Sequence, residues 1–265
     1  MLYKSGENKK EIYMEENKFK GERLVAKSQV SKNVLMEHLA RYRLVKGPKE
    51  SIVLDIGCGT GAGSNILAKN FKKVYGVDIS SDAIEYCKKN WKQKNISFLV
   101  GSGTDIPFPE NTFDRVAAFE VFEHIKNWRK FLSELKRVTK RYGKIYISTP
   151  NKDVYSPGAK KPINPYHFFE MTEKQFKEAL SKDFKIESLL GQRTPIYNDH
   201  WIWKIVDPLL FIFHGILPFT FHKALKFRII NWIKPELSLN DIVFLDQSNW
   251  IKKSRQMVAV CIKNK

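Results

Sequence analysis

The feature that most constrains this chain is a glycine-rich turn that directly follows an apolar run. Residues 51–63 read SIVLDIGCGTGAG, with glycines at 57, 59 and 61. A continuous apolar run of this length is typical of a parallel strand buried on both faces. Glycines let the backbone approach a ligand closely, and the N-terminus of a following helix offers free N–H groups. The stretch therefore predicts a strand, turn and helix that bind a cofactor through Gly57, Cys58, Gly59 and Gly61.

Strand and helix patterns then alternate along the chain. Strands are expected at 51–57, 73–79, 96–101, 113–120, 144–149, 184–191 and 257–262. Helices are expected at 31–45, 62–69, 81–91, 126–140 and 172–180, the first with Ser31 as its N-cap and the last without a capping box. Alternating strands and helices predict an α/β fold with a doubly wound, mostly parallel, seven-stranded sheet.

Three acids stand at the ends of the first three expected strands. Asp55 precedes the glycine turn, and Asp78 follows it by about 20 residues, where an acid accepts both hydroxyls of a ribose. An acid at that place also binds the ribose of NAD. The glycine spacing and a third acid distinguish the cofactor expected here from NAD. Asp105 can accept from an adenine amino group, with Ile106 packing on the ring.

With these motifs the chain resembles the class I S-adenosylmethionine (SAM)-dependent methyltransferases, of the methyltransferase type 11 kind. The resemblance is carried by VLDIGCGTG, VYGVDIS, TDIPFPENTFDRV, FEVFEHI and YGKIYISTPN, and it covers residues 50–151. It implies a Rossmann-like fold and SAM as cofactor, with S-adenosylhomocysteine as product. One departure is Arg141-Tyr142-Gly143, where the family commonly has Lys-Pro-Gly.

A narrower resemblance points to a bacterial and archaeal subgroup whose members often belong to surface-glycan biosynthesis. It is carried by the segments GERLV (21–25), LMEHLARYRL (35–44), STPN (148–151), NPYHFFEMT (164–172) and LLGQR (189–193). It implies that Arg41 and Tyr42 help to close over the methionine end of SAM.

The same reasoning divides the chain into four parts. Residues 1–49 are expected to form an N-terminal arm and helix, and residues 50–191 the SAM-binding domain. Residues 192–255 are expected to be a helical aromatic and basic insertion, and residues 256–265 the last strand of the sheet.

Methyl transfer from a sulfonium needs a positioned nucleophile and, for some acceptors, a base. Glu120 ends the fourth expected strand and is expected to contact the methionine end of the cofactor. Glu123, His124 and His167 are the catalytic candidates. His124 is a candidate general base because an unperturbed imidazole titrates near pH 6.5. The alternative is that Glu123 and His124 orient the loop, and that His167 makes a structural hydrogen bond.

Several kinds of chemistry are disfavoured by the sequence. The fourth strand is followed by FEVF rather than the [ND]PP[YF] motif of enzymes that methylate nucleobase amino groups, and no Pro-Cys nucleophile is found there. No metal-ligand spacing is recognisable, so no metal is expected. The three cysteines lie far apart, which favours a reducing cytosol. The charged N-terminus has no apolar core, so no signal peptide is expected.

The insertion contains an aromatic and basic stretch, residues 201–234. Lys204, Asp207 and His214 interrupt it, so its apolar run is far shorter than the ~20 residues of a membrane span. Two amphipathic helices are expected, and their second apolar face needs a partner. That partner could be the active site beneath a lid, a membrane interface, or a second copy of the chain.

The sequence therefore predicts a SAM-dependent methyltransferase that acts on oxygen of a small or lipid-linked glycan intermediate. Two different acceptors stay open: a lipid or quinone at the membrane surface, and RNA. The net charge of +18 motivates the last, although nucleic acid is the less favoured partner. The protein is expected to be cytoplasmic, with peripheral contact at the inner face of the membrane as one alternative, and to be a monomer or homodimer.

Overall fold

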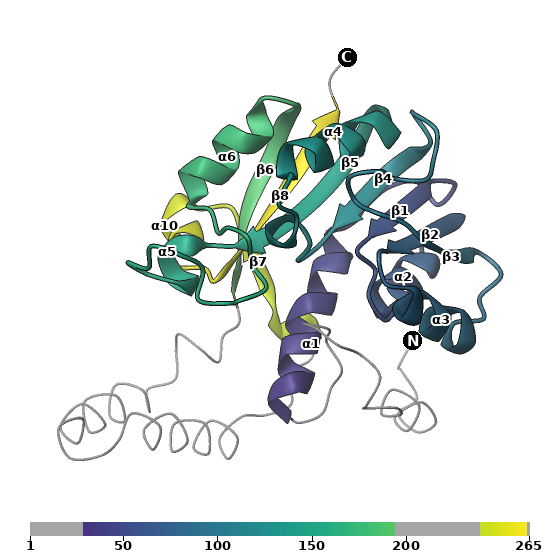
Figure 1. The fold of residues 1–265 in the computed structure, drawn as a ribbon, viewed down its shortest axis with the longest axis horizontal. Helices are drawn as coiled ribbons and strands as arrows, with labels where there is room; N and C mark the ends of the chain where they lie inside the picture. The colour runs from purple at the N-terminus through teal and green to yellow at the C-terminus, as the bar shows by residue number, and fades with distance from the viewer. Residues whose placement is uncertain (1–28, 194–238, 264–265) are drawn as a thin grey trace.

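The computed structural model of the protein describes residues 29–193 and 239–263. These residues form an eight-stranded sheet with helices on both faces, in the strand order β3-β2-β1-β4-β5-β8-β6-β7 (Figure 1). The expected arm, residues 1–28, and most of the expected insertion, residues 194–238, lie outside the described residues.

The strands are β1 Ile52–Ile56, β2 Lys73–Asp78, β3 Ile96–Val100, β4 Phe113–Ala118, β5 Thr139–Pro150, β6 Phe184–Arg193, β7 Val243–Leu245 and β8 Gln256–Lys263. The helices are α1 Gln29–Arg41, α2 Ala62–Ala68, α3 Ser81–Asn90, α4 Trp128–Val138, α5 Lys152–Tyr155, α6 Glu173–Ser181 and α10 Ser248–Ile251. Single 3-10 turns are η2 Tyr42–Leu44, η3 Phe122–His124 and η5 Leu239–Asp241.

The sheet has a parallel part and an antiparallel part. Strand β1 pairs in parallel with β2 and β4, β2 with β3, and β4 with β5. Strand β8 lies antiparallel between β5 and β6, and β7 is antiparallel to β6. The predicted α/β, mostly parallel fold is confirmed. The eighth strand, β7, was not predicted, because three residues are too few to show an alternating pattern.

Alternate side chains of the strands point to opposite faces and build two layers of core. On one face, Leu54 of β1 belongs to a cluster with Phe131 of α4 and Phe176 of α6. On the other face, Val53 of β1 belongs to a cluster with Leu67 of α2. Figure 1 shows α4 and α6 along the β4–β6 half of the sheet, and α2 and α3 beside β1–β3. Because β1, β2, β3, β4 and β5 run parallel, their carboxyl ends lie together at one edge of the sheet.

Two details of the expected helices were wrong. Helix α1 begins at Gln29, so Ser31 lies inside the helix and is not its N-cap. Helix α6 does begin with a capping box: the Thr172 hydroxyl accepts from the Gln175 N–H, and the Gln175 side chain accepts from the Thr172 N–H. Gln175 stands at the third helical position, where the motif requires it.

Among the helices of residues 29–193 and 239–263, none is long and apolar enough to cross a membrane.

Candidate active site

The glycine turn after β1 takes a conformation that requires glycine. Gly57, Gly59 and Gly61 have φ of 71°, 52° and 79°, in the left-handed region that other residues rarely adopt. A Cβ added to Gly57 would lie 2.1 Å from a methyl of Val121, whereas one added to Gly59 would meet nothing within 4 Å. The backbone at Gly59 therefore borders open space, where a ligand could approach it closely.

Asp55 lies beneath this turn and is fully buried. Its carboxylate accepts hydrogen bonds from the Tyr42 hydroxyl at 3.0 Å and the Ser64 hydroxyl at 2.6 Å. Burial raises the pKa of Asp55 to about 7, although these two hydrogen bonds oppose the rise. Asp55 and Tyr42 thus join the segment before β1 to the glycine turn and to α2.

Asp78 at the end of β2 faces the turn from the side. Its two carboxylate oxygens accept from the N–H of Gly59 and of Ser80, both at 2.9 Å. The next side chain, Ile79, is 75% exposed. A carboxylate beside an exposed apolar side chain suits a ribose next to a nucleobase.

The third predicted acid and its neighbour lie elsewhere. Asp105 is exposed, and Ile106 is buried in the core, where its N–H donates to the Glu134 carboxylate at 2.9 Å. Ser102, Gly103 and Thr104 of the same loop border the cavity instead.

Glu120 follows β4 with φ of 55°, which is unusual for a residue with a side chain and is typical of functional sites. Its carboxylate accepts from the Ser148 hydroxyl at 2.7 Å and from the Gln256 amide at 2.8 Å. Arg41 forms an ion pair with it at 3.7 Å. Glu120 is therefore held by β5, β8 and the end of α1.

Arg41 is itself buried and anchored on both sides. Its Nε donates to the Gln192 side chain at 2.7 Å, and one of its terminal nitrogens lies 3.2 Å from Nδ1 of His38. Burial, with the nearby Arg41 charge, lowers the pKa of His38 to about 3. His38 is therefore neutral and can accept this hydrogen bond. Sequence reasoning had not singled out His38 or Gln192, although Gln192 lies in the LLGQR segment.

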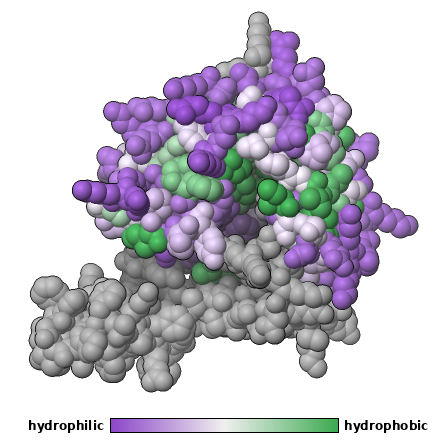
Figure 2. All heavy atoms as spheres, in the orientation of Figure 1, coloured by the Kyte–Doolittle hydropathy of each residue, from purple (hydrophilic) through white to green (hydrophobic). Residues whose placement is uncertain are grey.

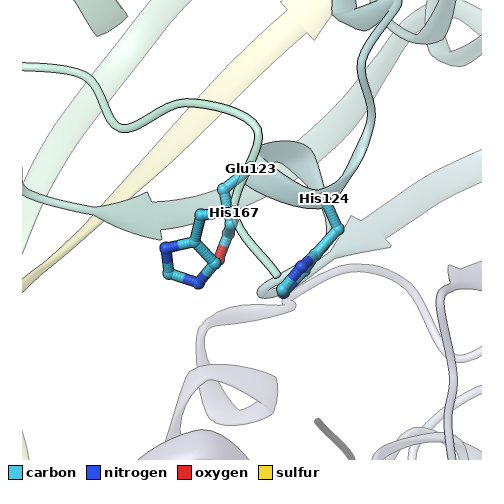
Figure 3. A group of neighbouring side chains, drawn as sticks. All are labelled: Glu123, His124 and His167. Carbon is cyan, nitrogen blue, oxygen red and sulfur yellow. The ribbon is translucent and has the colours of Figure 1, made fainter. Parts of the chain in front are cut away.

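The three catalytic candidates come together at one place. Glu123 and His124 lie side by side on the turn after β4, and His167 reaches the same place from the loop before α6 (Figure 3). One ligand atom from each lies within 4.8 Å of the others. Burial and the neighbouring Glu120 raise the pKa of Glu123 well above its usual range. His167 is buried and hydrogen-bonded through Nδ1 to Glu170 at 2.8 Å.

One cavity of about 860 Å³ connects these groups, a size typical of small-molecule sites (about 300–1,000 Å³). The face drawn in Figure 2 is hollowed near its middle, with apolar side chains on either side of the hollow. The predicted residues that line the cavity are Arg41, Gly57, Cys58, Gly59, Asp78, Ile79, Glu120, Glu123, His124 and His167. The predicted residues outside the lining are Tyr42, Asp55, Gly61, Asp105 and Ile106.

The cavity also has a basic and aromatic side. Its cationic lining residues, beyond Arg41, include Lys126, Arg193, Lys253 and Arg255. The Arg193 guanidinium lies 4.3 Å from the ring centre of Trp250, and that of Arg255 lies 5.0 Å from the ring centre of Tyr155. Three of these cations and Trp250 belong to residues 192–255. Sequence reasoning had expected a lid or interface there and had named no ligand contacts.

The chain is similar to known methyltransferases. Residues 54–147 match the family model described as a methyltransferase domain. A Mycolicibacterium smegmatis protein named "Probable S-adenosylmethionine-dependent methyltransferase" is 32% identical over 52% of this chain and 54% of its own length. A fatty-acid O-methyltransferase of the same organism is 34% identical over 39% of this chain and 38% of its own. The chain thus spans about half or less of the length of these relatives.

Among solved structures, a similar fold is found in a Haloferax volcanii protein complexed with the Trm112 methyltransferase activator. The TM-score is 0.59 at 16% identity, over 89% of this chain and 94% of that one. At this identity the match shows the fold alone. The open backbone at Gly59, the Asp78 carboxylate and the exposed Ile79 fit a nucleoside cofactor. The family match and the relatives therefore support a class I methyltransferase domain in this chain, with SAM as its cofactor.

Proposed function

We propose that the protein transfers the methyl group of SAM to oxygen of a small or lipid-linked glycan intermediate. The observation that carries this proposal is a single cavity lined both by Gly57–Gly59 and by the Glu123, His124 and His167 cluster. A cofactor bound along the glycine turn would then share one space with polar groups suited to a hydroxyl. The glycan itself is supported by the resemblance of the sequence to the surface-glycan subgroup.

The chemistry is an in-line displacement at the methyl carbon. The acceptor hydroxyl gives up its proton to a general base, for which His124 and His167 are the candidates, or to water. Its oxygen forms the new O–CH₃ bond, and the S–CH₃ bond breaks with its electron pair going to sulfur. When bound, SAM supplies the activated methyl group. The protein would position the acceptor oxygen against that methyl and exclude water. Glu120, fixed by Ser148 and Gln256, would contact the methionine end of the cofactor.

The basic side of the cavity favours an acceptor that carries negative charge. Arg193, Lys253 and Arg255 line it together with the aromatic rings of Trp250 and Tyr155. One guanidinium group can donate two parallel hydrogen bonds to the oxygens of a phosphate. Aromatic rings offer flat apolar surfaces. A sugar attached to a lipid through a phosphate presents both kinds of group. This arrangement supports the lipid-linked form of the acceptor.

A lipid carboxylate is the second candidate acceptor, because a relative named fatty-acid O-methyltransferase matches part of this chain. Arg193, Lys253 and Arg255 would bind that carboxylate. A quinone at the membrane surface and RNA are the remaining candidate acceptors.

The test is incubation with SAM labelled in its methyl group and cell extracts divided into glycan, lipid and RNA fractions. Label in a glycan-containing lipid fraction is expected, and label confined to simple lipids or to RNA contradicts the proposal.

Cofactor binding is tested separately by calorimetry with S-adenosylhomocysteine. We expect Asp78→Ala to weaken binding at least about tenfold, because it removes the carboxylate that faces the glycine turn. Asp82→Ala is the matched control, since Asp82 is exposed on α3 and does not line the cavity. Equal binding by both variants contradicts the cofactor assignment.

We also propose that the protein acts in the cytoplasm and contacts the membrane peripherally through residues 201–234, which lie outside the described residues. Replacing Phe211, Ile212 and Phe213 with Ser is expected to reduce sedimentation with anionic liposomes. Unchanged partition would point to a lid or a dimer surface instead.

A further inference from the structure

Glu123 has an unusual environment for a carboxylate. It is fully buried, and neither carboxylate oxygen has a partner within hydrogen-bond geometry among the described residues, although the Thr149 hydroxyl and a backbone N–H lie near enough to oppose the rise of its pKa. Buried charges are normally paired or bound to metals, because an unpaired one loses its hydration without compensation. The nearby Glu120 adds a second negative charge, although Arg41 lies close by. This environment favours binding of a positive ion at Glu123.

The two histidines are oriented as metal ligands usually are. Nδ1 of His124 lies 3.0 Å from the Tyr166 carbonyl oxygen, which can only accept, so Nδ1 carries the proton. Nδ1 of His167 lies 2.8 Å from the Glu170 carboxylate, which also accepts from the Ser156 hydroxyl. With Nδ1 donating in each ring, Nε2 is the nitrogen through which each histidine would bind a metal. Metal-binding histidines almost always donate their other N–H to a carbonyl or carboxylate in this way.

One contact that a metal would replace involves His167 and Asn164. Nε2 of His167 lies 3.0 Å from the side-chain nitrogen of Asn164. The other end of that amide accepts from the Tyr166 N–H at 3.0 Å, so Asn164 would stay anchored after the exchange.

From these observations we propose that Glu123, His124 and His167 bind one divalent metal ion through a carboxylate oxygen and two Nε2 atoms. One ring nitrogen of each histidine and a carboxylate oxygen of Glu123 already lie within 4.8 Å of one another, and Figure 3 shows the three side chains at this place. Two imidazoles and one carboxylate suit first-row divalent ions and leave coordination positions open.

The role of this ion rests on the proposed function. Glu123, His124 and His167 line the same cavity as the glycine turn, so an ion held by them would bind the acceptor hydroxyl there. A metal-bound hydroxyl loses its proton more readily, and its oxygen is fixed in place. The two histidines would then act as ligands rather than as general bases, and the hydroxyl proton would pass to water through the open cavity.

The test measures metal binding by purified, untagged, metal-stripped protein, because a polyhistidine tag binds metals itself. MnCl₂ is the probe, since Mn²⁺ prefers oxygen and imidazole ligands over the thiol of Cys58, which also lines the cavity. Free Mn²⁺ is followed by electron paramagnetic resonance, and the melting temperature is measured with and without the ion. We expect one ion per chain and a rise in melting temperature.

Glu123→Gln, His124→Ala and His167→Ala are each expected to weaken Mn²⁺ binding at least about tenfold. Glu123→Gln keeps the shape of the side chain and leaves no ionisable group at this buried position, so it should fold. Glu178→Gln, an exposed change on α6, is the control and should bind as the wild type does. Absent binding by the wild type, or equal binding by the wild type and all three variants, overturns the proposal.

The two proposals fail in different ways. Mn²⁺ binding without S-adenosylhomocysteine binding would refute the methyltransferase and leave the metal site standing. Methyl transfer that persists in chelator, by protein that binds no Mn²⁺, would refute the metal site alone.

Discussion

Gly59 allows a sharp test of the cofactor site, because the chain contains a matched glycine outside it. Gly59 and Gly158 have φ of 52° and 72°, and a Cβ added to either would meet nothing within 4 Å. Gly59 lines the cavity, whereas Gly158 lies in the exposed loop after α5. Replacing either with Ala therefore places a side chain in left-handed backbone without a clash in the protein itself.

Both variants should lose similar stability. The left-handed conformation costs a residue with a Cβ about 1–2 kcal/mol. At about 2–4 °C per kcal/mol, the melting temperature should fall by about 2–8 °C in each variant. The two variants should differ in their affinity for S-adenosylhomocysteine, because only the methyl group at position 59 would occupy space next to that ligand.

For Gly59→Ala we expect S-adenosylhomocysteine to bind at least about tenfold more weakly, a loss of about 1.4 kcal/mol or more. For Gly158→Ala we expect unchanged affinity. Calorimetric titration at a temperature where both are folded measures the difference. Equal affinities would falsify the conclusion that the cofactor approaches the backbone at Gly59.

Two further predictions concern stability. A Cβ on Gly63 would lie 1.9 Å from the ring of Tyr42. Gly63→Ala should therefore lower the free energy of unfolding by about 1–3 kcal/mol through overpacking. An unchanged midpoint of urea unfolding would contradict this packing. Hydrogen bonds from Arg137 lower the pKa of Glu134 to about 2, which is below its value in the unfolded chain. The contribution of the ionised Glu134 to the free energy of unfolding is therefore present above about pH 4.5 and is lost as the pH falls toward 2. Glu134→Gln should therefore unfold at lower urea than the wild type at pH 7, with the difference shrinking below pH 4.5; a difference of the same size at pH 2.5 would refute this linkage.

The cofactor half of the site could be predicted because its signals are local. An apolar strand, a glycine turn and a helix follow one another within residues 51–68, and each leaves its own pattern in the sequence. Asp78 ends β2 as predicted and lines the cavity, because parallel strands bring their carboxyl ends to the same edge of a sheet. Ile106 was expected against the cofactor, but its N–H is tied to Glu134 and its side chain packs in the core.

The other half of the site is built from contacts that are distant in the sequence. Arg41 meets Gln192 across 151 residues, and Gln256 meets Glu120 across 136. These contacts depend on β8 entering the sheet antiparallel between β5 and β6, which no short segment reveals. Glu123 and His124 are adjacent in the sequence, but His167 joins them only through the fold. For this reason no metal-ligand spacing was recognisable.

The division between local and distant contacts also bears on the acceptor. The family match ends at residue 147, before His167, three basic residues that line the cavity (Arg193, Lys253 and Arg255) and all of β8. The matched segment contains the glycine turn and Asp78, which face the expected cofactor. The acceptor side combines Glu123 and His124 from the end of that segment with side chains contributed later in the chain. Because Arg193 and residues 250–256 belong to the antiparallel strands or pack on them, they can vary without disturbing the parallel strands that hold the glycine turn. Acceptor specificity should therefore follow His167, Arg193 and residues 250–256 rather than the motifs shared with other methyltransferases.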